Sequence, residues 1–153
     1  MNISANKVAL LATLHCLTGC AVGEVIGMII SSALNWSAVP SIMLAVGLAF
    51  LFGYGFSAIP LLKSGLGLKK SLTLVLLADT ISIGVMEVVD NTFILVVPGA
   101  IHAGLDTSLF WISMALALLA AFVVAFPVNK YLIGRGMGHA VVHKYHHQEH
   151  SHY

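Results

Sequence analysis

The chain has 153 residues, of which 59% are hydrophobic and 8% are charged, with a formal net charge of +1 and a mean hydropathy of +0.97. Soluble domains carry about 25% charged residues, and a chain this short leaves much of its surface outside any core. The composition therefore excludes an ordinary soluble domain, predicts that a lipid bilayer covers most of the surface, and does not favour nucleic-acid binding.

Four stretches are apolar enough for membrane-spanning helices, which need about 20 mostly apolar residues. They are residues 8–33, 41–62, 71–97 and 107–128. Turn-forming residues such as Pro98-Gly99 separate them, and Trp36 and Trp111 fall near one membrane face. We expect one all-α domain at 1–137, an integral membrane four-helix bundle, followed by a histidine-rich cytoplasmic tail at 138–153.

The basic residues all fall on one side of this layout. They precede the first span, flank the connection between the second and third, or follow the fourth: Lys7, Lys63, Lys69, Lys70, Lys130, Arg135 and Lys144. By the positive-inside rule, this distribution predicts a multi-pass protein of the cytoplasmic (inner) membrane with both termini in the cytoplasm.

The start of the chain has a competing interpretation, because Leu17-Thr-Gly-Cys20 matches a bacterial lipoprotein cleavage box. However, the apolar run continues past Cys20 to Ile30, whereas polar mature sequence follows the core of a signal peptide. His15 and Cys16 would also interrupt that core. We therefore interpret this segment as the first membrane span.

The two halves of the chain carry similar motifs in matching places. The motif pairs are Val22-Gly-Glu-Val-Ile26 with Val85-Met-Glu-Val-Val89, and Pro60-Leu-Leu-Lys63 with Pro127-Val-Asn-Lys130. In the register of the first pair, Cys16 is equivalent to Asp79. An even number of spans in each repeat predicts two parallel helical hairpins related by an axis along the membrane normal, with the first and third spans facing it. Chance similarity between apolar segments is the alternative.

Small residues in the first span would let another helix approach closely. They are Gly19, Ala21, Gly23 and Gly27.

Ionisable side chains and thiols inside the spans are the candidate ligands of a functional site. They are His15, Cys16, Cys20, Glu24, Asp79, Glu87 and Asp90, with His102 and Asp106 nearer the outer surface. Such groups are costly in the bilayer and usually face the bundle interior. No Lys or Arg lies within the spans to neutralise them, so protonation, hydrogen bonds between helices or a bound cation must compensate.

The inner part of this set has soft ligand atoms. Cys16 and Cys20 lie four residues apart on one helix face, Glu24 and Met28 continue that face, and His15 borders it. Thiolates with an imidazole suit Cu(I) or zinc better than calcium or magnesium. The alternative is a pair of inert buried thiols, because free cysteine behaves as a small hydrophobic residue.

The outer part of the set has harder ligand atoms. Glu24, Glu87, Asp90, His102 and Asp106 converge if the first, third and fourth spans meet. Carboxylates with an imidazole would accept zinc, manganese or iron(II), and they could equally form a proton relay. The alternative is a structural role for protonated carboxyl groups that are hydrogen-bonded between helices.

The tail contains a third candidate group. His139, His143, His146 and His150 would share one face of a helix, and histidine-rich tracts are typical of metal-binding segments. A polar, solvated tail is the alternative.

Several of these motifs resemble a prokaryotic integral membrane domain of unknown function. The resemblance rests on His15-Cys-Leu-Thr-Gly-Cys20 (the family's His-Cys-x-x-Gly-Cys signature), Gly23-Glu24, Ala78-Asp-Thr80 and Gly138-His-Ala-Val-Val-His143. It covers nearly the whole chain and implies a four-helix domain without an assigned activity. A loose association of such domains with copper-handling neighbours agrees with the soft ligands.

We expect an integral membrane metal-binding protein that binds or translocates a soft transition metal such as Cu(I), with zinc or another transition metal as a variant. The alternative is an accessory or structural subunit of a larger membrane complex, for example a copper-dependent oxidase or monooxygenase. Independent catalysis is not favoured, because the sequence has no nucleophile–base–orienter set and no phosphate-binding loop. The small number of spans favours a homo-oligomer or a larger complex.

Overall fold

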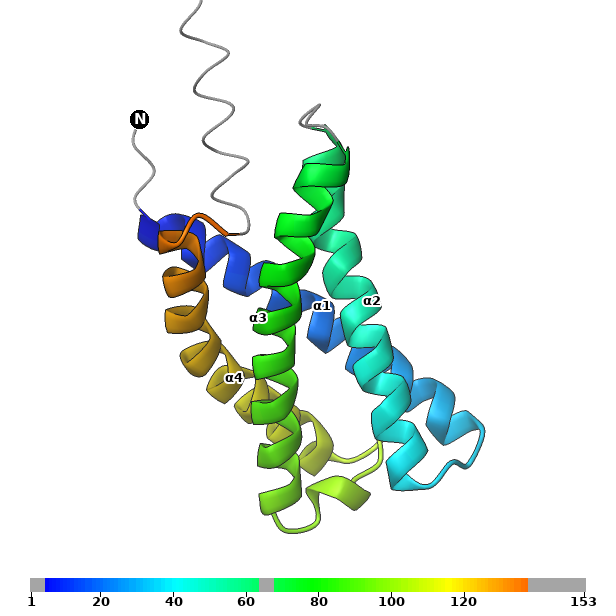
Figure 1. Cartoon of the computed structure of the whole chain (residues 1–153). Coiled ribbons are helices and arrows are strands. Elements are labelled where there is room, and N and C mark those ends of the chain that lie inside the picture. The colour runs from blue at the N-terminus through cyan, green and yellow to red at the C-terminus, as the bar shows by residue number, and fades with distance from the viewer. Residues whose placement is uncertain (1–4, 64–67, 138–153) are drawn as a thin grey trace, which may run out of the picture.

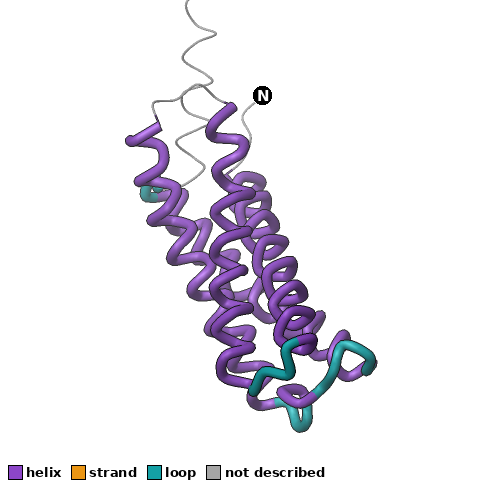
Figure 2. Tube along the Cα trace, turned by 90° about the vertical axis from the view of Figure 1, so that its right-hand side faces the viewer, coloured by secondary structure: helices purple, strands orange, loops and turns teal. Residues whose placement is uncertain are grey.

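The computed structural model describes residues 5–63 and 68–137. It contains the helices α1 (Ala5–Ala33), α2 (Ala38–Lys63), α3 (Leu68–Val96) and α4 (Ser108–Gly134), and a short 3₁₀ helix, η1 (Ala100–His102). Over these residues there is no strand (Figure 2), which confirms the all-α fold class.

The four helices run alternately up and down, as Figures 1 and 2 show. The starts of α1 and α3 and the ends of α2 and α4 lie at one end, which we call the basic end because Lys7, Lys69 and Lys130 belong to it. The other end, the loop end, holds residues 34–37 and 97–107. Packing is most extensive between α1 and α2 and then between α3 and α4, which confirms a bundle of two hairpins with α1 and α3 parallel.

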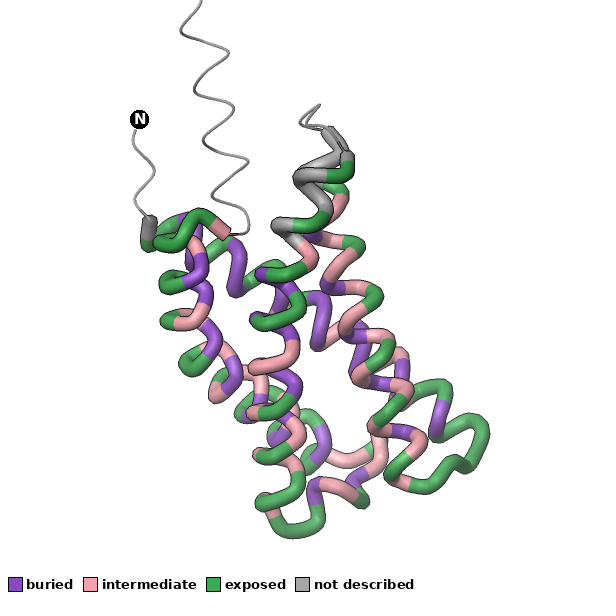
Figure 3. The backbone as a smooth tube through the Cα atoms, in the orientation of Figure 1, coloured by how far each residue is buried: buried purple, intermediate pink, exposed green. Residues whose placement is uncertain are grey.

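Three of the helices contain stretches long and apolar enough to cross a membrane: Asn6–Ala33, Ala38–Ile59 and Ser108–Gly134. The fourth, α3, has 29 residues and packs against the other three. Large apolar side chains such as Met43 and Val123 point outward from the bundle, and in Figure 3 the exposed positions follow the outer faces of the helices. Water does not solvate such a surface well, so this is a multi-pass membrane protein.

The helices extend beyond the apolar stretches by up to two turns. Helix α4 continues through Pro127 to Gly134 and ends where Gly136 adopts a positive φ of 75°, because glycine enters this left-handed conformation without steric strain. At its other end the Thr107 side chain accepts a hydrogen bond from the Phe110 backbone N–H. Hydropathy therefore locates the spans, whereas capping residues determine where the helices end.

Glycines allow α1 and α2 to pack with their backbones almost in contact. A Cβ on Gly19, Gly23 or Gly27 would overlap the α2 backbone at Gly53, Ala49 or Ala45, respectively. The contacts advance by four residues on both helices in opposite directions, as in a small-residue interface of an antiparallel pair. The expected close approach is confirmed for the three glycines; Ala21 is only half-buried.

Helix α4 faces the bundle with a similar stripe at four-residue steps. The buried residues of this stripe are Ser113, Ala117, Ala121, Ala125 and Asn129. Their small side chains let α4 pack against both α3 and α1.

A buried hydrogen bond joins α4 to α1 near the basic end. The Asn129 Nδ2 atom donates to the Thr13 hydroxyl at 2.9 Å, and that hydroxyl donates to the Ala9 carbonyl at 2.7 Å. Replacing Thr13 by valine keeps the shape but leaves the amide without its acceptor, so we expect the free energy of unfolding in detergent to fall by about 1–2 kcal/mol.

A matched control for that variant is Thr18→Val on the same helix. Thr18 is exposed and bonds only to its own helix, at the Leu14 carbonyl. Its replacement should change the unfolding free energy by less than about 0.5 kcal/mol. Equal effects of the two substitutions would contradict the assignment of the hydrogen bond to bundle stability.

Candidate cation-binding site

Helices α1 and α3 face each other with pairs of polar side chains. Cys16 Sγ lies 4.0 Å from Asp79 Oδ1. Farther toward the loop end, Cys20 lies against Glu87 and Glu24 lies against Asp90. We call these three pairs the thiol–carboxyl ladder. It brings together the residues that were equivalent in the internal repeat, Cys16 and Asp79, as direct neighbours.

All six members of the ladder are buried, and none is more than 8% exposed. Each of the four carboxyl groups has one oxygen without a hydrogen-bond partner among the described residues: Glu24 Oε1, Asp79 Oδ2, Glu87 Oε1 and Asp90 Oδ1. The other Glu87 oxygen accepts from Asn91 Nδ2 at 3.3 Å. Buried polar atoms are normally paired, so the ladder has unused capacity to bind a proton or a cation.

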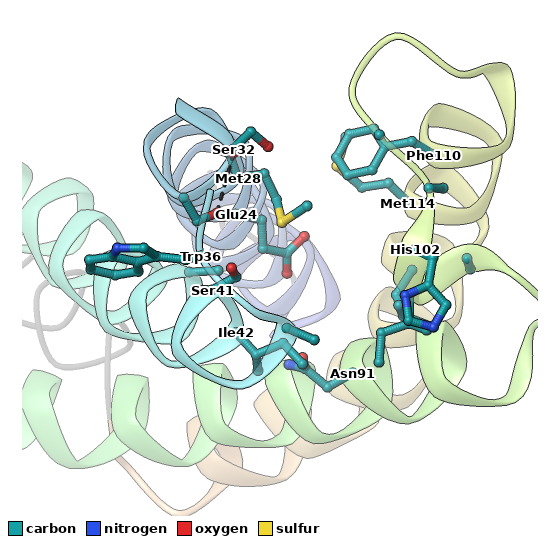
Figure 4. A pocket seen from close by; sticks show the side chains of 18 of the residues that line it. Glu24, Met28, Ser32, Trp36, Ser41, Ile42, Asn91, His102, Phe110 and Met114 are labelled. Atoms are coloured by element: carbon teal, nitrogen blue, oxygen red, sulfur yellow. Dashed lines mark hydrogen bonds between the residues drawn. The ribbon is translucent and has the colours of Figure 1, made fainter. Parts of the chain in front are cut away.

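A pocket of about 530 Å³ opens at the loop end and reaches the ladder. Glu24, Glu87 and Asp90 form its polar floor. Apolar side chains such as Ile42 and Phe110 form much of its wall (Figure 4). No Lys or Arg of the described part of the chain lines it. The floor therefore offers negative or protonatable groups without a compensating cationic side chain.

Of the remaining candidate ligands, some line the pocket and others do not. His102 is exposed on η1 and lines the pocket, whereas Asp106 is exposed, lies over Gly104 and does not line it. His15 is exposed on α1 and close enough to Asp79 to interact electrostatically. The tail histidines, His139, His143, His146 and His150, lie outside the described residues. The structure thus brings Glu24, Glu87, Asp90 and His102 to one pocket.

A sequence model of one protein family, "Domain of unknown function (DUF4396)", matches residues 5–138. The chain belongs to this family. The match covers all four helices of the bundle, so the whole ladder and the pocket lie within the DUF4396 domain. No curated protein matches the chain. No solved structure matches it either.

Two serines lie beside the Cys16–Asp79 pair of the ladder, and the sequence motifs did not indicate them. Ser57 of α2 lies against Asp79, and Ser82 of α3 lies against Cys16. Ser82 follows Asp79 by three residues and so shares its helix face, a signal that could have been used. Ser57 belongs to another helix, α2, and the hydropathy pattern of α2 does not indicate its inward face.

The described part of the DUF4396 domain contains no group of three His, Cys, Asp or Glu side chains arranged to hold a metal ion. The side chains of the ladder instead form a series of pairs along the α1–α3 interface, and each pair contains at least one carboxyl group. Such a series can pass protons between neighbours or bind a cation with two protein ligands and water. A site with few ligands releases its ion more easily than a closed structural site.

Proposed function

We propose that this DUF4396 protein is an integral membrane protein that binds a transition-metal cation in the thiol–carboxyl ladder and translocates it, with Cu(I) as the favoured ion. One observation carries the proposal. Glu24, Glu87 and Asp90 gather at the floor of a pocket, each with an oxygen that lacks a partner among the described residues, of which no Lys or Arg lines the pocket.

The need for a cation or protons follows from the surroundings. An ionised carboxylate inside a bilayer costs several kcal/mol unless it is paired, and here three of them share one floor. Protonation meets this requirement when the site is empty, and a metal ion meets it when the site is loaded. Exchange between the two would couple metal movement to protons.

The thiols favour a transition metal over magnesium or calcium. Cys20 lies against Glu87, and Cys16 lies against Asp79, so two of the three pairs of the ladder combine a sulfur with an oxygen atom. Sulfur ligands select Cu(I) or zinc, whereas magnesium and calcium require oxygen. Copper is the favoured cofactor or cargo, and zinc is the variant that elemental analysis would distinguish.

Among the described residues, the pocket meets the ladder on the side of the loop end. Ile83 and Met86 are fully buried among the cysteines, and Ile83 Cδ1 occupies the space that a Cβ at Gly53 would need. This apolar packing lies along α3 between Asp79 and the floor of the pocket. Translocation in our proposal therefore includes a step in which the Ile83 and Met86 side chains move.

The test is the metal content of the full-length protein, purified under reducing conditions in detergent and incubated with Cu(I) or Zn(II). Wild type should retain copper, and Cys16→Ser/Cys20→Ser should weaken Cu(I) binding by about a hundredfold, or about 2.7 kcal/mol. Thr18→Ser, on the same helix but outside the ladder, is the control and should bind as wild type does. A wild type that resists loading with either metal would exclude the proposal.

The alternative role, as an accessory subunit of a copper-dependent oxidase or monooxygenase, stays a prediction, as do a homo-oligomer, the inner-membrane location and cytoplasmic termini. A native mass measurement after solubilisation distinguishes the accessory subunit of a larger complex from the homo-oligomer. A stable monomer would exclude both.

A further inference from the structure

The wall of the pocket carries two thioethers and an imidazole from three separate elements. Met28 comes from α1, Met114 from α4 and His102 from η1. In Figure 4 the Met28 and Met114 side chains extend toward the pocket from different helices, and Met28 lies next to Glu24. Elements distant in sequence thus bring three soft or borderline metal ligands to the mouth of one cavity.

These methionines differ from the other described methionines, Met43, Met86 and Met137, because they line the pocket and the others do not. Met28 and Met114 are half-buried and reach the pocket. Met86 is sealed in the core, and Met43 is 71% exposed on the outer face of α2. Methionine often only fills gaps between helices. Here a gap-filling role does not account for the imidazole and the unpaired carboxyl groups in the same cavity.

The position of Met28 also connects the pocket with the ladder. Cys16, Cys20, Glu24 and Met28 follow one another at four-residue steps on a single face of α1, about 6 Å apart along the helix. An ion bound at Met28 would therefore lie one helical turn from the acidic floor. Once the carboxyl groups of the floor release their protons, their negative charge would attract the cation from Met28 to the floor.

We propose that Met28, Met114 and His102 form a capture site for a soft monovalent metal ion, Cu(I) or Ag(I), at the loop end of the bundle. The inference rests on the proposed function and names the site at which the ion enters. Thioethers and a neutral imidazole are uncharged ligands that select Cu(I) over magnesium, calcium or manganese. Because they carry no charge, they bind more weakly than thiolates and can release the ion to the ladder.

The experiment is a titration of the full-length protein in detergent with Ag(I), which is soft and does not change oxidation state under these conditions, and with Zn(II). The variant is Met28→Leu/Met114→Leu, a volume-conserving change that keeps the packing. We expect it to weaken the weaker class of Ag(I) sites by about tenfold or more and to leave Zn(II) binding unchanged. His102→Ala should weaken the same class. Met43→Leu, on the outer face of α2, should have no effect.

The outcomes separate the two proposals. Silver binding that is unchanged in Met28→Leu/Met114→Leu but lost in Cys16→Ser/Cys20→Ser would overturn the capture site and support the ladder as the metal site. Loss in the methionine variant with full retention in the cysteine variant would support the capture site and count against the ladder. Wild type that binds neither Ag(I) nor Zn(II) would overturn both.

Discussion

Replacing Gly23 by alanine should strongly destabilise the bundle. A Cβ at this position would lie 2.5 Å from Ala49 Cα and 2.6 Å from the Leu48 carbonyl carbon. Excess volume that side chains can absorb costs about 1–3 kcal/mol. Here the atoms in the way belong to the α2 backbone, so the helices must separate, and we expect a loss of at least about 3 kcal/mol. That is a large share of the 5–15 kcal/mol that stabilises a typical domain.

The matched control for this effect is Gly47→Ala on α2, where an added Cβ meets no atom within 4 Å. Because alanine favours the helix over glycine, the control should keep or raise stability by up to about 1 kcal/mol. Thermal unfolding in detergent, followed by circular dichroism and by the monodisperse fraction, measures both variants. If Gly23→Ala unfolds at the temperature of Gly47→Ala, the close contact between α1 and α2 is wrong.

Replacing the three carboxyl groups at the floor of the pocket by amides should raise the stability of the metal-free protein and lower its affinity for metal. In the triple variant Glu24→Gln/Glu87→Gln/Asp90→Asn, amides replace three of the four carboxyl groups that each have an unpaired oxygen. Without metal, the buried carboxyl groups of the wild type must take up protons at neutral pH, whereas amides are neutral already, so the metal-free protein should gain about 1–3 kcal/mol of stability. Copper and zinc binding should weaken by more than about a hundredfold, because the floor no longer carries charge.

A structural role for these carboxyl groups leads to the reverse result. If protonated carboxyl groups hold α1 and α3 together by hydrogen bonds, the triple variant should lose stability, and binding should not depend on it. Asp106→Asn is the control, because Asp106 is exposed in the loop and does not line the pocket. It should leave both stability and metal affinity at the wild-type values. Unfolding curves of metal-free protein and competition titrations distinguish the two roles.

The fold could be predicted because lipid imposes a simple pattern. Each helix needs a long apolar stretch, and all basic residues fall between or beyond such stretches on one side. The repeat also indicated that α1 and α3 face each other, since Glu24 and Glu87 are equivalent in it. The exact helix ends were less predictable. They depend on capping at residues such as Thr107 and Gly136, which hydropathy does not detect.

The sequence indicated those site residues whose side chains cost much free energy to bury in a bilayer. It did not indicate those whose burial costs little. Glu24, Glu87 and Asp90 stand out because a carboxyl group rarely lies in a bilayer without a role. Ser57 and Met114 do not, because their helices, α2 and α4, are apolar on every face and periodicity does not show which face points inward. A usable signal was the small residue at every fourth position, from Ser41 through Ala45, Ala49 and Gly53 to Ser57, all of which are buried.

The three acidic residues of α3 also bear on how the protein is made. An aspartate near the centre of a spanning helix costs about 2.5–3.5 kcal/mol at insertion, and Asp79, Glu87 and Asp90 all belong to this one helix. The insertion of α3 into the membrane would therefore be unfavourable if α3 were alone. The polar face of α1 gives it a partner, and α1 is synthesised first and packs tightly against α2. We therefore expect unequal tasks in biogenesis for the two hairpins: the first, α1 and α2, should serve as the template on which the second enters the membrane.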